Sequence, residues 1–258
     1  MATDVLHVQH ASMQFSDPMP GPKRDFGVIF ARDADVVGFT ECSQFHDLLV
    51  DHCERNGYTL VQPRRPDGDY VSTAVAVKAE QRVYDSGWVF VVPGLSRKPS
   101  EGGHNERGVT WVDFGFHRTR ITVAEVHMLT GWSGRDNARN DQILDQWRVS
   151  TRLAARAARG ARVGILMGDV NYDPDGPTPD TPSAILKEAG LVSVFDLAGT
   201  DQGTLGRRQI DQVYLARKDR RVKVDKVKVW TDKVEFTHTD HAQVSAWLSI
   251  RRRRAFRR

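Results

Sequence analysis

Apolar and polar positions along the chain follow two periods, one typical of strands and one typical of helices. Short runs rich in β-branched residues predict strands, and apolar residues at i, i+3 and i+4 predict helices. Strands are expected at residues 5–11, 35–40, 73–78, 82–92, 107–116, 119–127, 163–167, 209–216, 221–230 and 242–250. Helices are expected at 24–32, 44–56, 136–159 and 181–189.

Local signals sharpen some of these boundaries. Ser43 occupies an N-cap position before one helix, and Asn56-Gly57 is a typical helix end. Gly160 follows the longest helical window. In the strand at 221–230, valines alternate with charged residues and the alternation slips at Asp225-Lys226. This slip predicts a β-bulge or a tight bend.

Composition is that of an ordinary globular protein. The chain has 258 residues, of which 40% are hydrophobic and 27% charged, which fits one domain over residues 1–250. The net charge is +4, and six arginines fall within residues 251–258, so the rest of the chain carries −2. An arginine-rich end is typical of an arm that attracts polyanions. A solvated, solubilising end is the alternative.

Several classes of protein are excluded or disfavoured. No apolar run approaches the ~20 residues of a membrane span, and the first residues, MATD, show no secretory signal. We therefore expect a cytoplasmic protein without a membrane partner. Two cysteines cannot form a disulfide scaffold at this size. Zinc binding by Cys42, His46, His52 and Cys53 is disfavoured because these residues do not share one helix face.

Polar residues that could carry chemistry follow apolar strands. Each one alone has an ordinary explanation, such as a helix cap, a buried imidazole or a turn. Together, carboxylates and a histidine at strand ends can hold Mg²⁺, which prefers oxygen ligands, and leave an imidazole to handle a proton. These residues are Glu41, His127, Asp169, Asn171, Asp240 and His241, with Asp211 expected inside the strand at 209–216.

Five sequence blocks together resemble a known family. In order and spacing they are similar to the signature blocks of the endonuclease/exonuclease/phosphatase superfamily, over about residues 5–250. The resemblance implies an α/β fold, a four-layer αββα sandwich in which two mainly antiparallel sheets pack face to face with outer helices. The blocks are DVVGFTE (35–41), EVHML (125–129), GDVN (168–171), RQIDQVYL (208–215) and TDHAQV (239–244).

Under that resemblance, one group of residues would handle a metal ion and the attacking water. Glu41 would ligate Mg²⁺, or Mn²⁺, and Asp240 would complete the metal or water network. Asp169 would orient and help to deprotonate the water, and Asn171 would bind phosphate oxygens beside it. In-line attack on a phosphodiester places charge on oxygen, which a divalent cation stabilises while it lowers the pKa of bound water.

A second group would act on the phosphate itself. His241 would contact the scissile phosphate or protonate the leaving group, held in one tautomer by Asp211. His127 would steady the phosphoryl oxygens. Arg107 matches an arginine of the deoxyribonuclease-like branch and is a candidate for substrate binding. A positioned acid or base contributes about 10²- to 10⁴-fold, and a carboxylate beside His241 favours its protonated form near neutral pH.

The first strand departs from the family pattern. The family has an Asn at its end and an Asp or Asn two residues later, where this chain has Ser12 and Gln14. Both are neutral oxygen donors, so we count Ser12 as a substrate contact and Gln14 as a metal ligand beside Glu41. A second metal site and full activity are open questions.

The substrate is expected to be nucleic acid, with DNA favoured and RNA open. EVHML is similar to the Thr-His-Leu type of deoxyribonucleases, sphingomyelinases and phosphatases, which disfavours abasic-site repair. A buried strand at 87–92 disfavours a sphingomyelinase hairpin. The arm and the basic strand at 221–228 favour a polyanion, and Trp132 and Tyr172 could stack bases.

Two alternatives stay open. One is a phosphatase or phosphodiesterase of small esters such as nucleotides or inositol phosphates. The other is a nucleic-acid-binding protein whose catalysis is weakened through Ser12 and Gln14.

Overall fold

The computed structural model describes residues 3–13, 21–92, 107–128, 141, 144–146, 148–150, 152–153, 162–171, 185, 188–204, 209–216, 222–231 and 241–251. Four predicted site residues, Gln14, Trp132, Tyr172 and Asp240, lie outside these described residues, as does most of the arginine-rich end.

The described strands form two six-stranded sheets. The first has the order β11-β12-β1-β2-β4-β3 and the second β5-β6-β7-β8-β10-β9. Pairing is antiparallel except for β1 with β2 and β7 with β8. The first sheet contains β1 (Thr3–Ser12), β2 (Val36–Thr40), β3 (Tyr58–Val61), β4 (Ala74–Lys78), β11 (Val222–Trp230) and β12 (Gln243–Arg251). The second contains β5 (Val83–Val92), β6 (Arg107–Phe116), β7 (Thr119–His127), β8 (Arg162–Asp169), β9 (Leu191–Ser193) and β10 (Asp211–Ala216).

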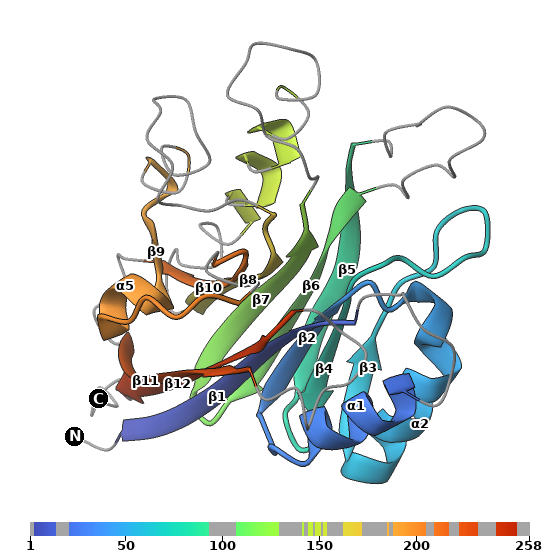
Figure 1. The fold of residues 1–258 in the computed structure, drawn as a ribbon, viewed down its shortest axis with the longest axis horizontal. Helices are drawn as coiled ribbons and strands as arrows, with labels where there is room; N and C mark the ends of the chain where they lie inside the picture. Colours follow the sequence, from blue (N-terminus) through green and yellow to red (C-terminus); the bar gives the residue numbers. More distant parts are fainter. Residues whose placement is uncertain are drawn as a thin grey trace, which may run out of the picture.

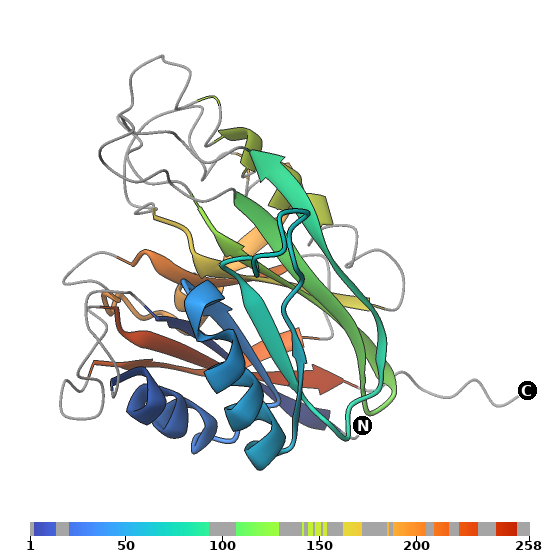
Figure 2. The same ribbon diagram turned by 90° about the vertical axis from the view of Figure 1, so that its right-hand side faces the viewer.

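Helices cover the outer faces of the two sheets (Figures 1 and 2). The helices α1 (Gly21–Phe30) and α2 (His46–Asn56) pack on the first sheet, where Phe26 and Leu49 meet Phe39. Over the second sheet, Leu153 and Ile185, both in helical conformation, pack against buried strand residues. The short helix α5 (Val194–Ala198) follows β9 and packs into the space between the sheets. The result is a four-layer αββα sandwich, as predicted.

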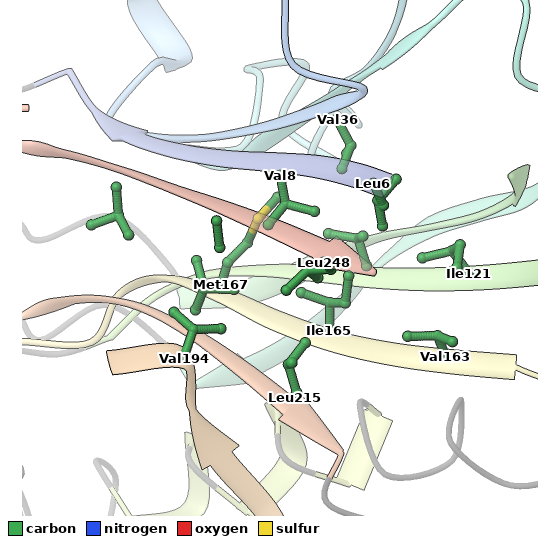
Figure 3. Packing of buried hydrophobic residues seen from close by; sticks show 14 of the residues in the cluster. Leu6, Val8, Val36, Ile121, Val163, Ile165, Met167, Val194, Leu215 and Leu248 are labelled. Atoms are coloured by element: carbon green, nitrogen blue, oxygen red, sulfur yellow. The ribbon is translucent and has the colours of Figure 1, made fainter. Parts of the chain in front are cut away.

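The largest hydrophobic cluster fills the space between the sheets (Figure 3). Alternate residues of each strand point into it, so Leu6 and Val8 of β1 face Ile165 and Met167 of β8, with Leu248 of β12 beside them. All five side chains are buried. Burying one such side chain contributes about 1.5–3 kcal/mol. This packing holds the two sheets in one relative position, which the site at their edge requires.

Most expected elements are confirmed, two of them with identical bounds, Arg107–Phe116 and Thr119–His127. The bulge is also confirmed, because the register of β11 against β12 shifts between Val224 and Lys226. The described residues at 141, 144–146, 148–150 and 152–153 are helical, as are 185 and 188–189. Cys42 and Cys53 are buried free cysteines in the apolar layer beneath α1 and α2.

Other expectations are wrong in detail. Ser43 is not an N-cap: it begins a 3-10 turn at Ser43–Phe45 that leads into α2, with no capping bond from a side chain. The strand β5 is not buried, because it forms a sheet edge and Phe90 is 48% exposed. Asp211 begins β10 instead of lying inside it. Arg251 is the last residue of β12, where it pairs with Thr3, so the arm begins no earlier than residue 252.

Three short elements were not predicted, namely β3, β9 and α5. None exceeds five residues, too few to establish a period. Within the described part of the chain, no helix combines the length and apolar character needed to cross a membrane.

Gly168 permits the close pairing of β7 with β8 directly before Asp169. Its φ is 146°, and a Cβ there would lie 1.9 Å from the carbonyl oxygen of Val126. We expect Gly168→Ala to lower the free energy of unfolding by about 2 kcal/mol or more, through backbone strain and the clash. Chemical denaturation measures this change.

Gly27 provides the control for that experiment. It is exposed within α1, and no atom lies within 4 Å of the Cβ it would carry. Gly27→Ala should raise the free energy of unfolding by about 0.5–1 kcal/mol. Equal stability of the two alanine variants would contradict the prediction.

Candidate active site

One edge of the sandwich collects strand ends from both sheets. Here β1 and β2 end side by side, with Ser12 opposite Thr40 and Glu41 next along the chain. In the other sheet His127 ends β7 opposite Asp169, which ends β8 and pairs with Asp211 at the start of β10. Polar residues that are distant in sequence therefore meet because parallel strands end, and an antiparallel strand begins, at the same edge.

Two residues at this edge have a left-handed backbone. Glu41 has a φ of 56° and Asn171 a φ of 50°, a conformation that costs a non-glycine residue energy and is frequent at functional sites. The backbone N–H of Asn171 donates to Asp169 Oδ1 at 2.9 Å, and its Nδ2 donates to the Met128 carbonyl at 3.0 Å. These bonds fix the turn that carries Asp169.

The ring of His127 lies between two carboxylates. Its Nε2 is 3.5 Å from Glu41 Oε1 and 3.7 Å from Asp169 Oδ2. Burial and the charge of Arg107 hold the pKa of His127 well below its usual range, so the ring is neutral at neutral pH. A neutral ring here can contact a phosphoryl oxygen or water through one N–H.

Asp211 accepts hydrogen bonds from two histidines. Its Oδ2 is 2.8 Å from His241 Nδ1, and its Oδ1 is 3.1 Å from His10 Nε2. Burial raises the pKa of Asp211, but the two hydrogen bonds and the charges of the histidines outweigh burial and lower it to about 2. Asp211 is therefore an ionised acceptor that holds His241 by Nδ1.

His10 and Glu125 join the site without having been predicted. The Nδ1 of His10 is 2.9 Å from Glu125 Oε1, and both side chains are fully buried. Burial lowers the pKa of His10, but Glu125 and Asp211 outweigh it and raise it to about 10. The only sequence signal was Glu125, an acidic residue between apolar residues of β7. His10 lies on a strand with several other polar residues, and the partner of each lies on a distant strand.

The carboxylates at the edge repel one another. Burial and the charge of Asp211 raise the pKa of Asp169 to about 7. Arg107, also buried, is a nearby cation: burial lowers its pKa, and the charges of Glu41 and Asp169 act against that effect. Asp169 is thus able to exchange a proton near neutral pH.

The donor set fits a divalent cation. Glu41 and Asp169 each have a carboxylate oxygen within 4 Å of His127 Nε2, and oxygen donors of this kind suit Mg²⁺ or Mn²⁺. Asp169, Asp211 and His241 also each offer a ligand atom within 4.8 Å of the others, although both oxygens of Asp211 already face imidazoles.

Buried polar atoms at the same edge are ready for a ligand. Four of them have no hydrogen-bond partner among the described residues, which suits a bound polar group. They are Ser12 Oγ, Thr40 Oγ1, Arg107 Nε and His127 Nδ1.

The structure therefore brings together most of the predicted site residues: Ser12, Glu41, Arg107, His127, Asp169, Asn171, Asp211 and His241. It adds His10 and Glu125 behind them.

Solved structures share this fold at low sequence identity. An endonuclease/exonuclease/phosphatase family protein from Bacteroides thetaiotaomicron aligns with a TM-score of 0.71 and 17% identity, over 98% of this chain and 100% of that one. D. rerio TDP2 complexed with a single-strand DNA product gives 0.68 and 14%, over 95% and 98%. The mannosyl-6-phosphatase Bt3783 of B. thetaiotaomicron gives 0.68 and 18%, over 94% and 99%.

No protein-family model and no curated protein matches the chain. At these identities the structural likenesses show the fold, which is that of the endonuclease/exonuclease/phosphatase structures.

His10 predicts a particular dependence of stability on pH. Its pKa is raised from 6.5 to about 10, so the stabilisation linked to its protonation is complete below about pH 6.5 and is lost as the pH rises through about 10. We expect the difference in unfolding free energy between the wild type and His10→Gln to shrink over that window. Chemical denaturation at a series of pH values measures it.

His7 is the matched control on the same strand. Burial lowers its pKa to about 4, so His7→Gln should change the pH dependence only on the acid side, between about pH 4 and 6.5. A difference for His10→Gln that stays constant from pH 6.5 to 10 would contradict the charge assigned to His10.

Proposed function

We propose that this protein is a divalent-metal-dependent phosphodiesterase that hydrolyses nucleic acid, with DNA favoured over RNA. The carrying observation is the meeting of Glu41, His127, Asp169 and the Asp211–His241 pair at one edge of two packed sheets. Phosphodiester hydrolysis uses carboxylates to bind a metal ion and to activate water, and it uses imidazoles to contact the phosphate and to transfer protons.

Glu41 is the proposed metal ligand, together with Gln14 and Asp240 from outside the described residues. A bound Mg²⁺ or Mn²⁺ would stabilise charge on the phosphoryl oxygens and lower the pKa of bound water. Ser12, which stands where the family pattern has Asn, offers a neutral hydroxyl. One metal ion suffices for the proposed reaction.

The side chains divide the remaining work. Asp169, with its pKa near 7, orients the attacking water and accepts its proton, and Asn171 binds phosphate oxygens next to it. His127 and Arg107 hold the other phosphoryl oxygens. His241, held by Asp211 at Nδ1, protonates the leaving oxygen. Proton transfer from the attacking water and to the leaving oxygen keeps charge from building up on either atom in the transition state. This stabilisation is the proposed source of the rate enhancement.

A basic aromatic strand favours a polyanionic substrate. Lys228 Nζ lies 3.2 Å from the centroid of the Trp230 ring, with Arg32 over the same ring at 3.9 Å. Lys226 lies 4.8 Å from the ring of Trp247. These cations lie on β11 and near its end, and β11 runs toward the edge where His241 lies. The D. rerio TDP2 structure that shares the fold was solved with a single-strand DNA product.

A phosphatase of small phosphate esters is the second candidate. The fold is shared with a mannosyl-6-phosphatase, and the same edge could bind a terminal phosphate. Competition distinguishes the two, because a small-ester enzyme would turn over its substrate without inhibition by DNA.

The Asp169→Asn variant tests the central proposal. Wild-type protein should cleave end-labelled and circular DNA with Mg²⁺ or Mn²⁺ and stop with EDTA. Asp169→Asn should lower the cleavage rate by about 10²-fold or more, because the base that takes the proton from water is lost. Gel analysis of both DNAs also separates endonuclease from exonuclease action.

The control for that variant is Asp51→Asn, an exposed carboxylate on α2 that pairs with Arg55 and should retain full activity. Undiminished cleavage by Asp169→Asn would contradict the proposal. DNA binding without metal-dependent cleavage by the wild type would favour the non-catalytic alternative.

The arm and the basic strand should contribute affinity and no chemistry. Deletion of residues 252–258, or the double variant Lys226→Ala with Lys228→Ala, should weaken binding to long DNA and flatten its salt dependence. Cleavage of a dinucleotide analogue should stay within about 2-fold, because neutralised phosphates on long DNA are the source of the effect. An equal loss on the short substrate would show that these segments belong to the folded site.

A further inference from the structure

A charged histidine is buried between the two sheets, directly behind the proposed site. His10 is on β1 of the first sheet, whereas Glu125 on β7 and Asp211 on β10 belong to the second. The ring contacts one carboxylate through each nitrogen, at 2.9 Å and 3.1 Å. The imidazole therefore links the sheets by ionic contacts in a region that apolar residues otherwise fill.

The contacts form an unbroken row from the interior to the site edge. Glu125 Oε1 meets His10 Nδ1, His10 Nε2 meets Asp211 Oδ1, and Asp211 Oδ2 meets His241 Nδ1. Exposure increases only at the last member, since Glu125, His10 and Asp211 are fully buried. The Asp211 carboxylate is thus held on both sides, once by each imidazole.

Gly38 fixes the inner end of this row. A Cβ at Gly38 would lie 1.8 Å from Glu125 Oε2 and 2.7 Å from the terminal methyl carbon of Met167. The Glu125 carboxylate therefore packs directly against the backbone of β2, in space that exists only because residue 38 has no side chain. This packing restrains Glu125 beside His10.

Such a row is costly unless it has a use. Moving charges out of water carries a penalty that a buried ion pair repays only with good geometry, and apolar replacements of similar volume are often as stable or more so. Core packing alone therefore does not account for a charged row at this place. Its outer end, His241, points to a role in the reaction.

We propose that His10 is a positioning residue for the hydrolytic reaction: anchored by Glu125, it fixes the Asp211 carboxylate so that Asp211 holds the His241 ring in one orientation and tautomer. This inference rests on the proposed function, because it assigns His10 a role through His241. His10 itself does not touch the substrate.

A double-mutant cycle tests the coupling. The values of kcat and KM on a short DNA substrate are measured for the wild type, His10→Gln, His241→Ala and the double variant. His10→Gln should lower kcat by about 10- to 100-fold with KM within about 2-fold, as is typical when the partner that orients a functional histidine is removed. In the His241→Ala background the same change should lower kcat by less than about 2-fold.

Two variants make the cycle specific. His7→Gln is the control, because His7 lies on the same strand and stacks on Trp247 with ring centroids 4.3 Å apart, away from the row, and it should retain full activity. Glu125→Gln replaces the anchoring carboxyl group with little change of shape. It should show the same non-additivity with His241→Ala and a smaller loss of kcat. If His10→Gln does not fold, Glu125→Gln replaces it in the double-mutant cycle.

Equal losses of kcat in both backgrounds would overturn the inference, since His10 would then act independently of His241. A wild type without hydrolytic activity would refute the proposed function. The effect of His10 on the orientation of His241 would then be tested by NMR. The wild type should show a strongly downfield Nδ1–H proton of His241, assigned by its loss in His241→Ala. His10→Gln should shift or broaden that signal, and an unchanged signal would overturn the inference.

Discussion

The Asp211 carboxylate has to remain ionised in a part of the molecule from which water is excluded. A lone buried carboxylate would take up a proton instead. Two imidazoles, His10 from one sheet and His241 from the chain entering β12, supply the compensating hydrogen bonds. Each oxygen of Asp211 therefore faces one imidazole nitrogen, and Nδ1 is the nitrogen of His241 that faces inward.

The apolar core and the polar edge support each other. Leu6 and Val8 precede His10 on β1, and Met167 precedes Asp169 on β8, so each of these strands carries both core residues and residues of the candidate site. Because close-packed interiors do not deform continuously, the carboxylates and imidazoles at the edge are held with little freedom. Preorganised charges of this kind stabilise a transition state without having to reorient during the reaction.

The charges of neighbouring carboxylates and imidazoles shift the pKa values of Asp169 and Asp211 in opposite directions. Burial and the charge of Asp211 raise the pKa of Asp169, while two imidazoles lower that of Asp211. Neighbouring carboxylates therefore differ in proton affinity, as the different roles proposed for Asp169 and Asp211 require. Ser12 leaves the edge without one amide that the family pattern has, and His10 with Glu125 adds charge behind it.

The sequence by itself determined most strands and the order of the polar blocks, because alternation and residue type are local properties. Periodicity alone did not decide between two packed sheets and one doubly wound sheet, and the fold class came from the resemblance of the polar blocks to a known family. The strands Arg107–Phe116 and Thr119–His127 were predicted with the bounds that the structure has. Short elements such as β3 could not be predicted, and neither could the exposure of β5, which depends on its place at the edge of the sheet that the described strands form. Only the tertiary structure decided that Glu125, His10, Asp211 and His241 form one row, because each contact joins strands far apart in the chain and a polar residue in an apolar strand does not reveal its partner.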